Sequence, residues 1–528
     1  MQEARAVLFD TRSIQQYIFT ANKLKANIGA SYIVSHVFDE VLLGDVLKPG
    51  SFGIRLVDSE GWKNGEPIPS ELPEGNCYIA YMGGGNALIL FSDKGTDYRK
   101  EIVGAFTEQL LIKYPGLKIG VALGMFPLGD NDTQEDITKL YSELKNNQFI
   151  LYPQTNVSNT GLTLSCEVNG EAANAYVTAE PLVKKGEGRF FSQEVAAKVK
   201  VVDKANDALH GAFSNVLGDY VFPKELERLG QKETDNYIAV VHVDGNNMGT
   251  KFQDRKKLKE RGQLSKKVTD HTKEAFQNLL KDIVCNYESY NAFLDLQTDD
   301  KGNKELPLRP LVLGGDDITF VCNGRLALVY TQKLMEYLAT EKNDMKIDSC
   351  AGIAIVPTAY PFFRAYELAE QLCDVAKKKS RKEKDSSWLD FAILHGEQAP
   401  TIEQIRKQEY MGSRGDMHFG PYRVDGDGSY HYHVKKLLQA ARGIEQLQRE
   451  GKLPRNKWKE LRNVLQHDEH DMKRFMEQLR HNGYSLPHVA GWEKYEEKLW
   501  DDNKVGNYKT PYIDAIEIID FIPPKEAK

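Results

Sequence analysis

The chain has 528 residues, of which 41% are hydrophobic and 27% are charged, and its formal net charge is −7. This length exceeds what one core can bury and favours three or four domains of a soluble, globular protein. No apolar run reaches the roughly 18 residues of a membrane-spanning helix, and a negative chain has no global positive field to attract nucleic acid. We therefore expect a cytoplasmic protein with no membrane partner.

The six cysteines are scattered and include no Cys-x-x-Cys pair. Paired cysteines at short spacing are the usual signature of a structural zinc site. We therefore expect buried free thiols in a reducing compartment, and no zinc.

Residues 1–130 are predicted to form one α/β unit. Its hairpin turns at Gly83-Gly84-Gly85-Asn86, which carries no carboxylate. The predicted elements, in chain order, are a strand at 4–10, helices from about Ser13 and Gly29, a hairpin over 77–92, a helix, and a strand over 117–123.

Residues 131–235 lack a clear period and are interpreted as an insert with its own helices. Residues 236–395 then repeat the order of the first unit, with Gly314-Gly315-Asp316-Asp317 at the hairpin turn. The predicted elements of this second unit are a strand at 237–244, a helix at 265–290, the hairpin, a helix at 325–338 and a strand at 349–356.

Three landmarks relate the two units by nearly one offset: 244 − 10 = 234, 314 − 83 = 231 and 352 − 120 = 232. Agreement in both order and spacing indicates an internal repeat. Each unit is expected to be an antiparallel sheet backed by helices, like a polymerase palm. Residues 396–528 are charge-rich and are predicted to form a mostly helical end domain.

Paired carboxylates on the second hairpin point to metal chemistry. Nucleotidyl transfer uses two divalent cations about 4 Å apart, and Mg²⁺ or Mn²⁺ takes oxygen ligands. Asp316 and Asp317 would supply two carboxylates, and Asp244 at the end of the preceding strand would supply a third. The glycine-bounded turn after Asp244 suits a triphosphate; it consists of Gly245, Asn246, Asn247, Met248 and Gly249.

The alternative interpretation is an ordinary hairpin, because Gly and Asp dominate turns. Asp244 in the preceding strand and the echoed turn in the first unit favour a metal–nucleotide site instead. Lys377 and Arg381 lie four residues apart on one helix, so both could bind phosphates. For Lys378, Lys379 and Lys382 we expect only a solvated basic helix end.

Taken together, these motifs resemble the large two-palm subunit of type III CRISPR effector complexes, which is related to GGDEF diguanylate cyclases and adenylate cyclases. In the first unit the resemblance rests on Gln16-Tyr17-Ile18-Phe19 and on Ile28-Gly29-Ala30-Ser31. In the second unit and beyond it rests on the loop after Asp244, Gly314 to Asp317, Ala351-Gly352-Ile353-Ala354, Ala376-Lys377 with Ser380-Arg381, Ser387-Trp388-Leu389-Asp390 and Gly420-Pro421-Tyr422.

The resemblance implies two ferredoxin-like palms, an α/β (α+β) fold, with a helical insert and a C-terminal helical domain. It implies ATP-dependent synthesis of a nucleotide messenger, usually cyclic oligoadenylate, after the complex captures target RNA. Asp244, Asp316 and Asp317 would bind magnesium, with Asp316 and Asp317 catalytic. Gly245 to Gly249, Gly314, Gly315, Lys377 and Arg381 would bind the donor ATP, while Gly29, Ala30, Ser31, Gly85 and Asn86 would hold an acceptor nucleotide.

The implied partners are guide RNA and target RNA, reached through other CRISPR subunits, and small subunits that dock on the C-terminal helical domain. Two departures from the family pattern stand out. The first palm starts within about ten residues of Met1, so we expect no N-terminal HD nuclease domain. Asn246 stands where many relatives have an aspartate, which would weaken a metal contact or change the nucleotide pocket.

Three functions remain open from the sequence. The leading one is a nucleotidyltransferase of a type III effector complex, making cyclic oligoadenylate or an AMP conjugate, for example with S-adenosylmethionine. The second is a stand-alone nucleotide cyclase. The third is a catalytically silent scaffold subunit of the ribonucleoprotein, although all three carboxylates of the second palm are present.

Overall fold

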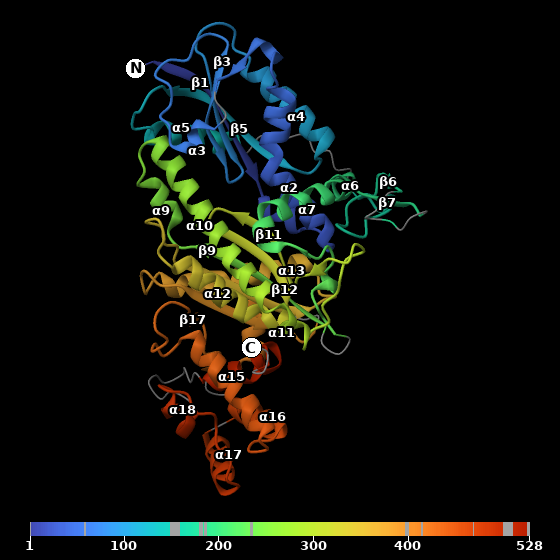
Figure 1. Cartoon of the computed structure of the whole chain (residues 1–528), viewed down its shortest axis with the longest axis vertical. Coiled ribbons are helices and arrows are strands. Elements are labelled where there is room, and N and C mark those ends of the chain that lie inside the picture. The colour runs from blue at the N-terminus through green and yellow to red at the C-terminus, as the bar shows by residue number, and fades with distance from the viewer. Residues whose placement is uncertain are drawn as a thin grey trace. The chain divides into compact units, whose positions relative to one another are not determined.

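The structure is a computed structural model that describes residues 2–57, 60–147, 159–178, 183, 187–232, 236–396, 401–412, 415–467, 469–499 and 510–524. The chain divides into two units, Met1–Ala212 with Asn247–Asp270, and Phe213–Asn246 with His271–Lys528. Figure 1 colours the chain from blue at the N-terminus to red at the C-terminus, so the first sheet runs from blue to teal and the second from yellow-green to orange.

The first unit is built on a five-stranded sheet with the order β2-β3-β4-β1-β5. The four long strands pair antiparallel with one another. The short edge strand β2 pairs in parallel with β3. The β3-β4-β1-β5 order with intervening helices is the ferredoxin-like arrangement predicted from the sequence. The strands are β1 (Glu3–Arg12), β2 (Arg55–Leu56), β3 (Asn76–Gly83), β4 (Asn86–Phe91) and β5 (Lys118–Pro127).

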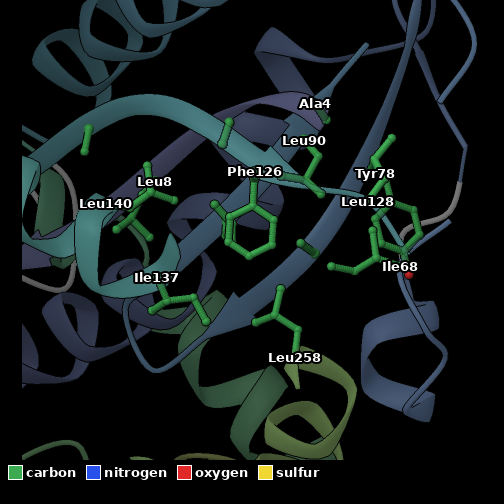
Figure 2. Close-up of a cluster of buried hydrophobic side chains, with 14 of the residues drawn as sticks. Ala4, Leu8, Ile68, Tyr78, Leu90, Phe126, Leu128, Ile137, Leu140 and Leu258 are labelled. Atoms are coloured by element: carbon green, nitrogen blue, oxygen red, sulfur yellow. The ribbon is translucent and has the colours of Figure 1, made fainter. Parts of the chain in front are cut away.

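Both faces of the first sheet are buried, because successive side chains of a strand point to opposite faces. On one face Leu8 and Phe126 pack with Ile137 and Leu140 of α5 and with Leu258 (Figure 2). On the other face Phe9 packs against aromatic rings of the covering helices. The main helices of this unit are α1 (Ile14–Phe19), α2 (Leu24–Val37), α4 (Arg99–Lys113), α5 (Gln134–Asn147), α6 (Gln193–Lys200), α7 (Val202–Ala212) and α9 (Met248–Gln253), with a π-helix at Phe38–Val46.

The second unit contains a six-stranded sheet with the order β11-β12-β9-β13-β14-β17. The first four strands repeat the antiparallel β3-β4-β1-β5 order, whereas β14 pairs with β13 in parallel. We expected purely antiparallel sheets, but both sheets are mixed. The strands are β9 (Tyr237–Gly245), β11 (Leu308–Gly314), β12 (Asp317–Asn323), β13 (Ser349–Pro357), β14 (Trp388–Ile393) and β17 (Tyr422–Arg423).

A shared irregularity supports the repeat independently. The β3–β4 pairing shifts between Ile79 and Tyr81, and the β11–β12 pairing shifts between Pro310 and Val312. Both positions differ by 231 (310 − 79 and 312 − 81). Bulges of this kind are local features that persist within families of related sheets. The two hairpins therefore share one backbone pattern.

The register corrects one landmark of the repeat. Asp10 pairs with Gly120, and Asp244 pairs with Cys350. The last strands therefore differ by 350 − 120 = 230, and Gly120 corresponds to Cys350 rather than to Gly352. The error of two residues keeps the same face of the strand, so the side-chain pattern did not reveal it.

Helices also pack on the second sheet. In α10 Phe276 contacts Phe320 of β12, and His271 lies 2.9 Å from the carbonyl oxygen of Leu338. The C-terminal part contains the expected helices, while β17 adds a strand to the palm sheet from beyond residue 395. The helices are α10 (Leu258–Cys285), α11 (Tyr287–Asn291), α12 (Ala327–Ala339), α13 (Phe362–Ser380), α14 (Ile402–Glu409), α15 (Val434–Arg449), α16 (Arg455–Gln466), α17 (Glu469–His481), α18 (Glu493–Lys498) and α19 (Pro511–Ile518).

A buried ion network joins the second palm sheet to the C-terminal helices. His418 lies 2.8 Å from Asp390 of β14 and 3.0 Å from Asp514 of α19, and Arg406 of α14 pairs with Asp390 at 2.5 Å. Tyr422 donates to Asp514 at 2.6 Å. Burial acts against the charged imidazole, but the carboxylates of Asp514 and Asp390 outweigh it and raise the pKa of His418 to about 9.

The described residues between 131 and 235 form several helices and a small hairpin. Helix α5 packs on β5 of the first sheet, although the sequence analysis placed it in the insert. A small hairpin of β6 (Ala175–Val177) and β7 (Arg189–Phe191) pairs antiparallel. In the described part of the chain no helix is long and apolar enough to cross a membrane.

The cysteines largely match the expectation of buried free thiols. Cys285 is the exception, because it is exposed on α10. Burial raises the pKa of Cys77 to about 12, so that thiol stays protonated near neutrality. The buried cysteines are Cys77, Cys166, Cys322, Cys350 and Cys373.

Candidate functional site

Two carboxylates meet at the end of neighbouring strands in the second palm. Ile318 of β12 pairs with Val243 of β9. Continuing this antiparallel register by one residue places Asp317 opposite Asp244. The amide of Gly245 donates to the carbonyl oxygen of Asp316 at 3.2 Å, so the pairing reaches the hairpin turn. Side chains directly opposite each other have Cβ atoms about 5 Å apart, close enough to share a ligand.

The hairpin turn itself needs its central glycine. Gly315 has φ 67, a left-handed conformation that side chains with a Cβ rarely adopt. Gly314 ends β11, Asp316 lies in the turn and Asp317 begins β12. The side chains of Asp244 and Asp317 are 30% and 32% exposed, so solvent and ligands can reach both carboxylates.

A lysine from the last turn of α13 lies over this edge of the sheet. Lys377 Nζ is 3.1 Å from Asp244 Oδ2 and 3.9 Å from Asp374 Oδ1. Burial acts to lower the pKa of Lys377, but neighbouring negative groups, Asp244 among them, outweigh burial and raise it. Lys377 is therefore a permanent cation beside the carboxylates. Arg381 caps the same helix and is exposed.

A histidine that no sequence motif indicated also lies at this site. His242 Nδ1 lies 3.4 Å from Asp317 Oδ1 and 3.3 Å from Thr319 Oγ1. Burial lowers the pKa of His242 to about 4, so the ring is neutral at pH 7 and does not cancel the carboxylate charge. The spacing in the sequence could have indicated His242 as a site residue. It precedes Asp244 by two residues and therefore lies on the same face of the strand.

The loop after Asp244 divides into two parts. Asn246 is half-buried, and its side chain donates to Ser380 Oγ at 3.0 Å and to the Ser386 carbonyl oxygen at 3.1 Å. Asn247 has φ 58 and begins α9, a conformation that asparagine tolerates better than most residues. Met248 is buried, while Gly249 is exposed. A phosphate-binding role for this loop stays a prediction.

The first palm has the same hairpin with different chemistry. Asn86 pairs with Asp10, which corresponds to Asp244 by its place in the sheet. Gly85 has φ 82, and a Cβ there would lie 2.6 Å from Ile14 Cδ1, so even a methyl group would be both strained and crowded. Burial raises the pKa of Asp10, and Arg12 opposes that shift. Gly85 and Asn86 therefore occupy a glycine-requiring turn with one carboxylate, Asp10, opposite it.

The other predicted acceptor residues lie on α2. Gly29 and Ala30 are buried, and a Cβ at Gly29 would lie 1.7 Å from the carbonyl oxygen of Lys198. Close packing against α6 therefore explains the glycine without a ligand. Ser31 is half-buried. Contact of these three residues with a nucleotide stays a prediction.

The basic end of α13 is only partly solvated. Lys378 and Lys382 are exposed as expected. Lys379 differs, because it is half-buried, pairs with Glu383 at 2.8 Å and lies over the rings of Trp388 and Tyr432. The expectation of a solvated surface lysine is therefore wrong for Lys379. Its aliphatic stem is partly buried, and its ammonium group lies over aromatic rings.

The carboxylates fit a hard divalent cation. Magnesium is usually held by one or two carboxylates together with substrate phosphates and water. Asp244 and Asp317, opposed on two strands, supply such a pair of oxygen donors. Within the described ranges no three His, Cys, Asp or Glu side chains gather closely enough to hold a metal by themselves. Magnesium binding at this pair stays a prediction.

Comparison with known proteins identifies the second palm. Residues 237–387 match the family described as Cas10/Cmr2, second palm domain. This match confirms the resemblance indicated by the sequence motifs. A sequence comparison with curated proteins finds no match.

Solved structures share the fold. The crystal structure of Csm1 in T. onnurineus matches with a TM-score of 0.53 at 12% identity, over 99% of this chain and 70% of that chain. A Csm1–Csm4 cassette in complex with pppApApA matches with a TM-score of 0.52 at 11% identity, over 98% of this chain and 69% of that chain. These likenesses confirm the two-palm α/β fold.

The match is shorter for other solved chains. For the apo Csm1–Csm4 cassette the TM-score is 0.41 at 12% identity, over 73% of this chain. Here the chain spans about half of its relative, 54% of that chain's length.

Proposed function

We propose that this chain is a magnesium-dependent nucleotidyltransferase of an RNA-guided type III CRISPR effector complex, acting on ATP at its second palm. The observation that carries the proposal is the pairing of Asp244 with Asp317 across two strands, with Lys377 3.1 Å from Asp244. A solvent-accessible carboxylate pair beside a fixed cation suits a metal-bound triphosphate. The match of residues 237–387 to the Cas10/Cmr2 second palm supports the same assignment.

The residues would divide the work as follows. Asp244 and Asp317 would hold the cation, with Asp316 in the turn between the strands as the third predicted ligand. Bound Mg²⁺ or Mn²⁺ would lower the charge on the phosphates and help to activate the attacking hydroxyl. Lys377 would exchange its contact with Asp244 for a phosphate oxygen, and Arg381 would bind farther along the triphosphate.

Neutral His242 would serve to orient Asp317 rather than to bind phosphate. An uncharged imidazole can donate one hydrogen bond to a carboxylate, and the negative charge of the carboxylate stays available for a cation. Such an outer contact fixes the direction of a metal ligand. His242 is thus a positioning residue in this proposal.

The first palm would hold the acceptor nucleotide. Its hairpin keeps one carboxylate, Asp10, opposite Asn86, which is a weaker arrangement for a cation than two carboxylates. Gly29, Ala30, Ser31, Gly85 and Asn86 remain the predicted acceptor contacts. The 3′-hydroxyl of the acceptor would attack the α-phosphate of ATP, forming a phosphodiester bond and releasing pyrophosphate.

The product we propose is an adenylate messenger, either cyclic oligoadenylate or an AMP conjugate. A relative of the same fold forms a complex with pppApApA and with a Csm4 partner. We propose comparable partners here: a neighbouring CRISPR subunit, small subunits on the C-terminal helices, and guide and target RNA bound through the assembled complex.

Labelled ATP and Mg²⁺ test this function directly. The protein is incubated alone and in its guide complex with target RNA, and pyrophosphate and nucleotide products are separated. We expect pyrophosphate release that depends on target RNA and is lost when Asp316 and Asp317 are both changed to Ala. A shift to Mn²⁺ should preserve the products.

Two outcomes would contradict the proposal. Absence of pyrophosphate under every condition would favour the silent scaffold. Full activity of the Asp316→Ala, Asp317→Ala double variant would place the chemistry elsewhere. Activity without any partner or RNA would instead favour a stand-alone cyclase.

A further inference from the structure

Asn246 connects the strand that carries Asp244 to the helix that carries Lys377. It follows β9 directly, two residues after Asp244. Its side-chain nitrogen donates to Ser380 Oγ at 3.0 Å, and Ser380 is the last residue of α13, three positions after Lys377. The same nitrogen donates to the Ser386 carbonyl oxygen at 3.1 Å. One amide group therefore links β9, which carries Asp244, to the end of α13, which carries Lys377.

The groups that this amide contacts are buried and hydrogen-bonded. Ser380 is 8% exposed and Ser386 is 1% exposed. Ser380 Oγ also donates to the Ser386 carbonyl oxygen at 3.1 Å, and the backbone amide of Asn246 donates to the Asp348 carbonyl oxygen at 2.7 Å. Trp388 Nε1 donates to Ser386 Oγ at 2.8 Å. Each contact limits the movement of the end of α13 relative to β9.

The acceptors decide which side chain fits at this position. A backbone carbonyl accepts hydrogen bonds and never donates them, so the group facing Ser386 must be a donor. An asparagine amide has two N–H donors, whereas an ionised aspartate has none. An aspartate would therefore place a negative oxygen against a buried carbonyl oxygen, and that contact is repulsive.

We infer that Asn246 is a positioning residue that sets Lys377 against Asp244, and that its neutral amide is required for this role. The inference rests on the proposed function, because it assigns Lys377 and Asp244 to one nucleotide site. It also reverses the expectation that the missing carboxylate at 246 weakens a metal contact. The amide points to Ser380 and Ser386, which are not metal ligands.

Two substitutions separate positioning from metal binding. Asn246→Asp introduces the repulsive carboxylate, and Asn246→Ala only removes the donor. Positioning predicts that Asn246→Asp is the more damaging change, with at least about tenfold weaker MgATP binding, because a displaced Lys377 loses part of its charge-assisted contact with phosphate. Asn246→Ala should lose less. A metal ligand at 246 predicts the opposite order, with Asn246→Asp equal to or better than wild type.

The protein without nucleotide provides a second measurement. Hydrogen exchange of the last turn of α13 should become faster in Asn246→Asp, and less so in Asn246→Ala, because that turn loses its attachment to β9. Ser380→Ala should have the smallest effect, since the Ser386 carbonyl still accepts from Asn246. Asn482→Asp is the matched control, because it adds the same charge at an exposed position. It should change neither exchange nor MgATP binding.

The failures of the two proposals are distinguishable. If wild type neither binds MgATP nor releases pyrophosphate, the proposed function falls, and the nucleotide part of this inference falls with it. If wild type is active and Asn246→Asp retains full activity and normal exchange in α13, the positioning role alone is wrong. The positioning role is supported if activity falls and hydrogen exchange in α13 becomes faster, with a larger effect for Asn246→Asp than for Asn246→Ala.

Discussion

The two palms share a backbone pattern but not a set of side chains. Both have the strand order of a ferredoxin-like sheet, and both hairpins shift register at the same point, Ile79 to Tyr81 and Pro310 to Val312. At the strand ends, however, Asp10 faces Asn86 in the first palm, where Asp244 faces Asp317 in the second.

This difference extends beyond the missing carboxylate. In the second palm, Lys377 from the helix after the last strand reaches Asp244. In the first palm, Asn147 of the helix after the last strand donates to the Val121 carbonyl oxygen at 2.9 Å. Ile14 fills the space beside Gly85. The duplicated fold therefore keeps its backbone while the side chains around its hairpin turn differ between the two copies.

The largest expected effect comes from one substitution made in both palms. Asp244→Asn should reduce pyrophosphate release about 10³-fold, or about 4 kcal/mol in activation free energy, because it removes a charge needed by the cation. Asp10→Asn at the corresponding position should cost at most a few-fold. Initial rates with saturating MgATP measure both.

Asp295→Asn is the control, since Asp295 is exposed in the same unit as Asp244. Equal losses from Asp10→Asn and Asp244→Asn would show that the two palms are chemically equivalent. That result would contradict the division of roles.

The next effect concerns the buried ion network of Asp390, His418, Arg406 and Asp514 beside strands β14 and β17 of the second palm. Asp514→Ala should destabilise this unit by about 3–5 kcal/mol, because it leaves the buried His418 charge without one partner. Asp520→Ala should cost less than about 1 kcal/mol, since the Asp520–Arg455 pair is exposed on both sides.

Hydrogen exchange followed by mass spectrometry can report each unit separately. Faster exchange in β14 and α19 is expected for Asp514→Ala, with the first palm sheet unchanged. If exchange rose equally in both palms, the network would be supporting the whole chain rather than one unit.

Sequence reasoning recovered what depends on local pattern. The strands, the two hairpins and the repeat follow from apolar periodicity and glycine turns. The pairing of Asp244 with Lys377 could be anticipated because each lies at the end of a predicted element. Matching glycines across the repeat placed the last strand two residues out of register, because a glycine marks a turn or a contact and not a register.

Other parts of the site required the folded chain. His418 meets partners 28 and 96 residues away, and no local pattern indicates that pairing. Ile14 beside Gly85 is an ordinary helix residue in the sequence. The side chain of Asn246 donates to residues 134 and 140 positions away, so no local pattern shows where it points. The family pattern suggested a weakened metal contact or a changed nucleotide pocket instead.

A third comparison uses alanine at equivalent turn positions. Gly85→Ala should destabilise the first palm by about 2–4 kcal/mol, because it combines a left-handed φ with crowding against Ile14. Asp316→Ala should change stability by less than about 1 kcal/mol. Exchange rates of the two hairpins measure both variants.

The companion Ile14→Ala variant tests the cause. It should recover part of the stability lost in Gly85→Ala, because it removes the crowding but not the φ strain. No recovery would mean that backbone strain alone keeps glycine at position 85.

The last expected effect is a pH dependence that is steeper in the second unit than in the first. In the described residues the buried histidines are His242, His271, His418 and His433, which all lie in that unit. The pKa of His418 is raised from 6.5 to about 9 in the folded protein, so its contribution is fully present below pH 6.5 and is lost as pH rises toward 9. The slope should approach about 1.4 kcal/mol per pH unit across that window.

Denaturant unfolding of the second unit between pH 6 and 10 measures this slope, and NMR titration of the imidazole locates the pKa. His488→Gln is the control, because His488 is 71% exposed and should leave the slope unchanged. An imidazole of His418 that titrates near 6.5 would contradict the prediction, since it would mean that the two carboxylates do not offset burial. The stability of the first palm should fall less steeply over the same window, because its described core contains no buried imidazole to release a proton.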